Sequence, residues 1–145
     1  MQDAVKEAID QTLTDYKIPS KIKRLTPKEA EIVYASAYGL YETAQYEQAG
    51  DLFLHLVFSN SFQEKYWRGL AAARQMEGKY VESLHAWALV ALLSEEDPEP
   101  HFYAAECMIS LGNREEAGKA LRAAEERAST HPELQRKIST LKEYL

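Results

Sequence analysis

The chain has 145 residues, of which 46% are hydrophobic and 28% are charged, and its formal net charge is −6 at pH 7. This composition is typical of a globular domain rather than a disordered tail, and the negative charge argues against a general affinity for nucleic acid or anionic lipid. No stretch approaches the roughly 18 apolar residues of a membrane span, and the acidic N-terminus lacks the apolar core of a secretory signal, so we expect a soluble protein that is not exported.

The first predicted element is a short amphipathic helix over residues 3–16. Its apolar residues recur at helical spacing, with acidic residues in the first turns: Ala4, Val5, Ala8, Ile9 and Leu13. Pro19 should end this helix, because proline lacks the amide donor and pushes the preceding residue out of the helical region. The basic segment K-I-K-R-L at 21–25 is short, and we interpret it as a solvated connector rather than a nucleic-acid patch.

Three copies of a 34-residue pattern follow, between about residues 32 and 129. The copies align on a tight turn and the small residue after it: A-Q-Y-E-Q-A at 44–49, G-K-Y-V-E-S at 78–83 and G-N-R-E-E-A at 112–117. Further positions keep the same spacing, namely Phe53, Trp87 and Leu121, then Leu56, Val90 and Ala124, and upstream of the turns Ala37, Ala71 and Ala105. Several positions that hold one spacing through three copies predict an internal structural repeat.

Each copy is expected to form a pair of helices. Thr26 is a suitable N-cap, Pro27 suits the first helical position, and a glutamate three residues after Thr26 completes a capping box. Gly78 and Gly112 lie where a helix ends in a left-handed residue. The expected pairs are 27–43 with 46–58, 63–76 with 80–93, and 100–111 with 114–128, each bound being approximate.

A final helix is predicted from the H-P-E-L segment at 131–134 to the C-terminus, where it would cover the exposed end of the stack. No alternating run of β-branched residues indicates a strand. The sequence therefore predicts an all-α fold in three parts: an N-terminal helix and connector at 1–24, three helix pairs within 25–128 (about 27–61, 62–95 and 98–129), and a capping helix at 130–145.

The stacked pairs imply a concave binding surface. A two-helix unit cannot bury its apolar stripe alone, so each unit stacks on the next, and a small rotation at each step curves the array. The first helices should line the concave side with the positions that the core does not use. These candidate peptide-binding residues are Tyr34, Tyr38 and Tyr41 in the first unit, Lys65, Arg68, Ala72 and Gln75 in the second, and Phe102, Glu106 and Ile109 in the third.

Tyr34, Tyr38 and Tyr41 have the spacing i, i+4, i+7, which places their rings on one stripe of a helix. Tyrosine offers a broad apolar area with few rotors and one hydroxyl, which suits the binding of an extended peptide. Lys65, Arg68 and Gln75 would then supply donors for the backbone carbonyls of that peptide. A tyrosine stripe at this spacing is also common in packed cores, and the N-terminal helix could cover it. The spacing by itself leaves both interpretations open.

Reactive residues do not converge on a catalytic or metal site. The four histidines share no ligand spacing, and the acidic run at 95–99 lacks the alternating ligands and the glycine of a calcium loop, so we interpret it as a solvated turn. Cys107, the only cysteine, cannot form an intrachain disulfide and is expected to be a small buried hydrophobe, which suits a reducing cytoplasm. There is no glycine-rich phosphate loop. We therefore expect no enzymatic activity, no cofactor and no metal.

Three stretches of the chain resemble the tetratricopeptide-type (class II) chaperones of bacterial type III secretion systems: residues 34–49, 65–75 and 99–113. The family pattern Y-x-x-G-L-x-A-x-x-Q appears at 66–75, and A-A-E-C-x-x-x-x-G appears at 104–112. The resemblance covers about residues 25–128 and implies a solenoid of three tetratricopeptide repeats.

The resemblance also implies a function in the bacterial cytoplasm. Such chaperones hold the hydrophobic, pore-forming translocators soluble before export and bind a short segment of P-x-L-x-x-P type in the concave groove. The groove aromatics of the family fall on Tyr34, Tyr38 and Tyr41. An alternative is a tetratricopeptide adaptor that binds the helix or tail of a partner in another multiprotein assembly.

The resemblance further implies a possible homodimer through the N-terminal segment, and a transcription coregulator role that has no sequence feature of its own here. The chain departs from the family in the connector, where Y-K-I-P-S-K-I-K-R at 16–24 replaces the usual Gly-Gly-x-x-Leu stretch. The dimer contacts of the family therefore transfer least directly to this chain.

Overall fold

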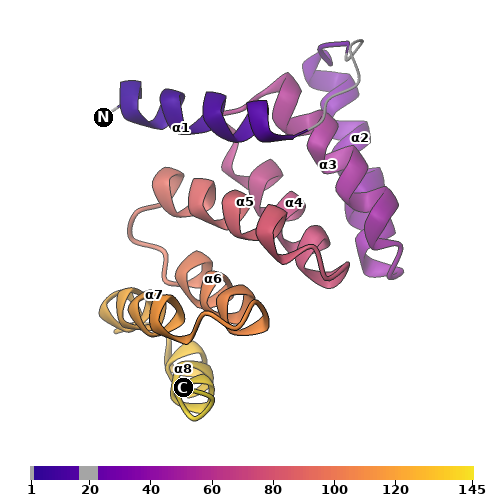
Figure 1. Ribbon diagram of the computed structural model, residues 1–145. Coiled ribbons are helices and arrows are strands. Elements are labelled where there is room, and N and C mark those ends of the chain that lie inside the picture. The colour runs from indigo at the N-terminus through magenta and orange to yellow at the C-terminus, as the bar shows by residue number, and fades with distance from the viewer. Residues whose placement is uncertain (1, 17–22) are drawn as a thin grey trace.

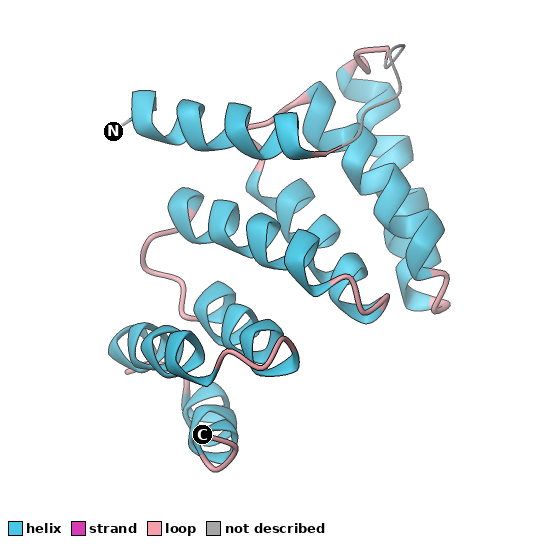
Figure 2. Cartoon of the chain, viewed as in Figure 1, coloured by secondary structure: helices cyan, strands magenta, loops and turns pink. Residues whose placement is uncertain are grey.

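Helices are the only regular secondary structure in residues 2–16 and 23–145, the part of the chain that the computed structural model describes (Figure 2). Eight α-helices follow one another along these residues (Figure 1). They are α1 (Gln2–Asp15), α2 (Pro27–Glu42), α3 (Tyr46–Ser59), α4 (Glu64–Met76), α5 (Tyr80–Leu93), α6 (Glu99–Ser110), α7 (Arg114–Arg127) and α8 (Pro132–Lys142). The predicted all-α fold is confirmed. None of the described helices is long and apolar enough to span a membrane.

The start of α2 shows that the predicted capping box forms. The Thr26 hydroxyl accepts a hydrogen bond from the Glu29 amide at 3.2 Å, and the Glu29 carboxylate accepts one from the Thr26 amide at 3.0 Å. The other helix ends lie close to their predicted positions, except that α8 ends at Lys142 rather than continuing to the C-terminus. The predicted stop at Pro19 lies outside the described residues, and the boundaries of the three predicted parts stay predictions.

The turns inside the three helix pairs share one backbone geometry. Ala44, Gly78 and Gly112 are 34 residues apart and have φ angles of 62°, 80° and 79°. In each turn the residue after the left-handed one donates a backbone hydrogen bond to the carbonyl four positions before the left-handed residue. In the first turn the Gln45 amide donates to the Leu40 carbonyl at 2.8 Å. The left-handed conformation predicted at the two glycines is confirmed. Ala44 adopts the same conformation with a side chain that disfavours it.

Small residues bring the helices close together, as the repeat predicts. Ala37, Ala71 and Ala105 are fully buried, and so are the small residues that follow each turn, Ala49, Ser83 and Ala117. The large residues of the same repeat, Phe53, Trp87 and Leu121, are buried beside them. Each helix from α2 to α8 packs mainly on its neighbours in sequence, so the array stays open on its inner side.

The N-terminal helix packs on α5 (Figure 1), whereas the tyrosine stripe of α2 lines an open groove to which α1 contributes no residue. At the end of α1 the Tyr16 hydroxyl donates to the Glu82 carbonyl at 3.1 Å, and its ring stacks on Trp67 with a centroid separation of 6.5 Å. Burial and the nearby charge of Glu82 raise the pKa of the Tyr16 hydroxyl. The alternative in which the N-terminal helix covers the tyrosines is therefore not the one that the fold adopts.

At the other end of the array α8 covers the last helix pair. Leu134 and Ile138 are buried in a second core cluster together with Leu121 and Ala124 of α7. The Gln135 amide donates to the Ala128 carbonyl at 2.8 Å, which ties α8 to the end of α7. The helix thus shields apolar surface that the third pair would otherwise expose.

Ala44 provides a test of backbone strain. We expect Ala44→Gly to raise the free energy of unfolding by about 0.5–1 kcal/mol, because glycine removes the cost of the left-handed conformation and loses only part of that gain to chain entropy. Gly78→Ala is the matched control and should lower it by about 1 kcal/mol. A Cβ at Gly78 meets no atom within 4 Å, so that change reports on the backbone alone.

Urea denaturation followed by circular dichroism measures both variants. A lower free energy of unfolding for Ala44→Gly would contradict this account of the turn.

Candidate functional site

An open groove with a volume of about 420 Å³ runs along the inner side of the array, between α2, α4 and α6. We call it the inner groove. It is lined by eight of the ten candidate residues from the sequence: Tyr34, Tyr38 and Tyr41 on α2, Lys65, Arg68, Ala72 and Gln75 on α4, and Glu106 on α6. The structure therefore brings residues from three separate helices to one surface. Their role in binding a peptide stays a prediction.

Phe102 and Ile109 are the two candidate residues that the structure places elsewhere. Phe102 is buried in the C-terminal core cluster, Ile109 packs against that cluster, and Tyr103 lines the inner groove in place of Phe102. Neighbouring residues on a helix point about 100° apart, so a choice between 102 and 103 decides which one faces the groove. The repeat carried a signal for Tyr103, because Tyr103 lies 34 residues after Gly69, which also lines the groove.

The three tyrosines divide between core and surface. Tyr34 is half-buried, with its ring 6.0 Å from Phe53 and 5.7 Å from Tyr66 between centroids, and burial raises the pKa of its hydroxyl. Tyr38 lies 6.1 Å from Tyr34 and is 51% exposed. Tyr41 packs edge-on against Tyr46 at 5.3 Å. Tyr38 is thus the member of the stripe that is most available to a ligand, and Tyr34 also supports the fold.

The floor of the inner groove is formed by close packing at Gly69. A Cβ at this position would lie 2.3 Å from the Phe53 ring, so only glycine lets the ring pass beneath α4. Farther along α4, Ala72 leaves space next to Trp87 and Tyr103, whose rings stack at 4.9 Å. The small residues of α4 therefore separate two aromatic compartments, one around Tyr34 and Phe53 and the other around Trp87 and Tyr103.

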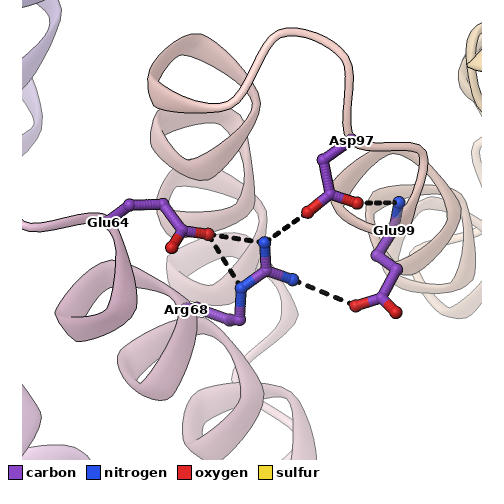
Figure 3. A network of polar contacts seen from close by, with 4 residues as sticks. All are labelled: Glu64, Arg68, Asp97 and Glu99. Carbon is purple, nitrogen blue, oxygen red and sulfur yellow. Dashed lines mark hydrogen bonds and ion pairs between the residues drawn. The ribbon is translucent and has the colours of Figure 1, made fainter.

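Arg68 is held by three carboxylates at the edge of the inner groove (Figure 3). Its Nη2 donates to Asp97 and to Glu64, both at 2.5 Å, its Nε donates to Glu64 at 2.8 Å, and its Nη1 donates to Glu99 at 3.1 Å. The second oxygen of Asp97 accepts from the Glu99 amide at 2.9 Å. The guanidinium thus joins α4 to the start of α6.

These contacts revise two expectations from the sequence. Asp97 and Glu99 were assigned to a solvated turn, but they bind Arg68 because the loop before α6 folds back toward α4. Arg68 was expected to donate to a peptide, yet most of its donors are already bound within the protein. We therefore interpret Arg68 as a residue that positions α6 relative to α4.

A second polar link joins α4 and α6 deeper in the inner groove. The Gln75 amide donates to the Glu106 carboxylate at 3.1 Å, while the Gln75 carbonyl accepts from the Trp87 indole at 2.9 Å. Burial raises the pKa of the Glu106 carboxyl, and the Gln75 hydrogen bond and the charge of Lys137 oppose that shift. Both the donor and the acceptor of the Gln75 side-chain amide are thus hydrogen-bonded within the protein. We therefore interpret Gln75, like Arg68, as a residue that positions the helices around the groove.

Lys65 differs from Arg68 because its ammonium group has no carboxylate partner among the ion pairs of residues 2–16 and 23–145. Its Nζ lies 4.5 Å from the centroid of the Tyr34 ring, which is a cation–π distance. Lys65 and the hydroxyl of Tyr38 are therefore the groups that the inner groove offers most freely to an acceptor on a ligand.

The single cysteine lies away from this groove in the core. Cys107 is buried, with its Sγ 3.6 Å from the Ser83 hydroxyl, and burial raises the pKa of the thiol. No cluster of three or more potential metal-ligating side chains occurs in the part of the chain that the structure describes.

Comparison with known proteins gives consistent relatives, although no protein-family model matches the sequence. The chain is 29% identical over 119 residues to the low calcium response locus protein H of Yersinia pseudotuberculosis, a match that spans 82% of this chain and 70% of that protein. Its fold is similar to a chain of the CopN–Scc3 complex, with 31% identity and a TM-score of 0.79 over 92% of this chain and 85% of the other.

A third similar protein has been solved with a bound peptide. The Yersinia enterocolitica type III secretion chaperone SycD, in complex with a peptide of the translocator YopD, is 27% identical to this chain. The TM-score is 0.75, and the match covers 85% of this chain and 94% of that one.

The Arg68 cluster predicts that replacing Arg68 lowers the free energy of unfolding more than replacing Lys65, a second cation of the inner groove. Arg68→Met leaves three carboxylates facing one another, and we expect it to lower the free energy of unfolding by about 1–2 kcal/mol. Lys65→Met is the matched control and should cost less than about 1 kcal/mol, because it removes only an exposed cation–π contact. Urea denaturation measures both losses, and equal losses in the two variants would refute the structural role of Arg68.

Glu106 predicts a stability that depends on pH. A carboxyl whose pKa is raised by folding stabilises the fold at low pH, and this contribution is lost as the pH rises through the folded-state pKa. Glu106→Gln mimics the protonated carboxyl, so we expect a higher free energy of unfolding than in the unmodified protein at pH 7. The difference should disappear as the pH falls below about 4.3, the usual pKa of glutamate.

Urea denaturation across this pH range measures the effect, with Glu143→Gln at the exposed C-terminus as the control. A difference that stays constant with pH would show that ionisation of Glu106 is not its cause.

Proposed function

Because the chain belongs to the tetratricopeptide-type chaperones of bacterial type III secretion translocators, we propose that it binds a hydrophobic translocator in the bacterial cytoplasm and keeps it soluble before export. The client segment is extended, of P-x-L-x-x-P type, and lies in the inner groove. The observation that carries this proposal is the convergence of tyrosines and small residues from α2 and α4 on one open, largely apolar surface.

The inner groove suits a short extended segment. Its volume of about 420 Å³ has room for a few side chains rather than for a whole helix. The two aromatic compartments, around Phe53 and around Trp87, would each take one apolar anchor, and full burial of a leucine side chain contributes about 1.5–3 kcal/mol. Lys65 and Tyr38 lie where they can donate to backbone carbonyls of the bound segment.

The mechanism requires no chemistry beyond binding. A translocator carries apolar segments that would aggregate in water, and a partner that binds the client before it aggregates shifts the equilibrium toward the soluble complex. The polar links at Arg68 and at Gln75 hold α4 and α6 in a fixed position relative to each other. They do not occupy the two aromatic compartments that would take the apolar anchors. The same surface can then release the client unchanged at the point of export.

The YopD peptide bound to SycD favours a translocator chaperone over a generic adaptor. Coexpression distinguishes the two functions, because a chaperone makes an insoluble client soluble, whereas an adaptor binds a partner that is already soluble. The candidate clients are chains with two hydrophobic segments. A homodimer is compatible with this function, and sedimentation of the free chaperone and of the complex would establish the stoichiometry.

Tyr38 is the residue that tests the site with the least effect on the fold. We expect Tyr38→Ala to weaken the binding of a fluorescein-labelled P-x-L-x-x-P peptide by about tenfold, because the ring covers the peptide without supporting the core. Tyr144→Ala, at a residue that is 63% exposed and far along the chain, is the matched control and should not change the affinity. Fluorescence anisotropy measures binding, and circular dichroism confirms that both variants fold. Unchanged binding in Tyr38→Ala would exclude the inner groove as the client site.

A further inference from the structure

Helix α5 is apolar around its whole circumference in its second half. Its residues from 86 to 93 read A-W-A-L-V-A-L-L, without one polar side chain. A helix of this kind is normally buried on all sides. Here α5 packs against α4, α6 and α1. Ala88 and Leu92 are nevertheless exposed, and Ala91 is only partly buried. This part of the surface is therefore apolar without a covering element.

The exposed face of α5 forms one wall of a second groove, with a volume of about 600 Å³. We call it the outer groove. Leu84, Ala88, Ala91 and Leu92 line it from α5, Ala104 of α6 lies along it, and α7 provides the opposite side. In Figure 1 α5 lies across the middle of the array, with α6 and α7 below it. Small side chains on its walls allow another backbone to approach closely.

The walls of the outer groove are helices whose backbone groups are already bonded, so an extended strand would find few backbone partners there. An amphipathic helix needs none, because its own backbone is satisfied and only its apolar face must match the groove. The apolar residues from Leu84 to Leu92 lie on one side of α5 over more than two turns, so an amphipathic helix would contact them along that length. The shape and chemistry therefore favour a helical occupant.

Charge at one end of the outer groove specifies this occupant further. Glu95 and Glu96 line that end, both are exposed, and neither side chain takes part in an ion pair recorded for residues 2–16 and 23–145. Arg127 lies beside them, where its guanidinium donates to the carbonyls of Glu95 and Ala123 and lies 3.9 Å from the Glu126 carboxylate. Three glutamate side chains beside one arginine leave a net negative charge at this end, which calls for a cation on the partner.

We propose that the outer groove binds an amphipathic helix of a partner protein, with small and leucine-sized residues on its apolar face and lysine or arginine at the end that meets Glu95 and Glu96. A second copy of this chain fits less well through its N-terminal helix, because α1 carries Asp3, Glu7 and Asp10. This site is additional to the client groove. Trp87 lines both grooves and forms the wall between them, so both can be filled at once.

The test uses labelled synthetic helices and the full chain. Two peptides carry a leucine and alanine stripe with a lysine pair at either the N-terminal or the C-terminal end, and matched peptides carry glutamate pairs instead. Fluorescence anisotropy should show that one lysine peptide binds about tenfold more tightly than its glutamate counterpart. The double variant Glu95→Lys, Glu96→Lys should reverse this preference. No saturable binding of either lysine peptide at millimolar concentration, or no reversal, would overturn the proposal.

Two point variants locate the binding. Ala88→Glu places a charge in the outer groove at an exposed position and should weaken binding about tenfold, whereas His85→Glu, on the same helix but outside the groove, should not. Tyr38→Ala should leave this binding unchanged and affect only the P-x-L-x-x-P peptide, which separates the outer groove from the client function. Loss of helix binding in Tyr38→Ala would overturn the proposal. So would conversion of a dimer to a monomer by Ala88→Glu in sedimentation, because a second copy would then be the occupant.

Discussion

The close approach of helices at small residues is the constraint on which the rest of this structure depends. Ala37, Ala71 and Ala105 are fully buried at equivalent positions of the three helix pairs, and each makes room for a large residue of the same repeat, such as Phe53 or Trp87. Because every pair packs mainly on the next one in sequence, none of the eight described helices crosses the inner side of the array. The inner groove is a direct consequence of this packing.

Polar contacts then set the shape of that groove at the points where apolar packing is absent. The first helices α4 and α6 are joined on the inner side by Arg68 with Asp97 and Glu99, and by Gln75 with Glu106. Both links lie beside apolar surface, which strengthens their hydrogen bonds and makes the loss of one partner costly. The groove is thus built from two classes of residue: aromatic side chains that can contact a ligand, and polar side chains whose partners lie within the protein.

The same array leaves two apolar surfaces of different character. The inner groove offers tyrosines, the ammonium group of Lys65 and narrow compartments, which suit an extended segment, whereas the outer groove offers alanines and leucines on the walls of packed helices, which suit a helix. Trp87 separates them and is bonded through its indole to Gln75. A protein of this size can therefore present two surfaces to partners because a stacked array has two sides, each lined by a different set of helices.

Local sequence determined the helices, the capping box at Thr26, the left-handed glycines and the buried small residues, because spacing and single-residue preferences act within one or two turns. It also placed the tyrosines of α2 on one stripe, and the family patterns at 66–75 and 104–112 indicated the class of protein. The tertiary structure alone decided that Tyr103 rather than Phe102 faces the inner groove, that Arg68 is bound by acids 29 and 31 residues away, and that α1 covers α5 instead of the tyrosines. The physical reason is that these outcomes depend on the rotation of each helix and on the path of the loops between them, which are set by the packing of the whole array.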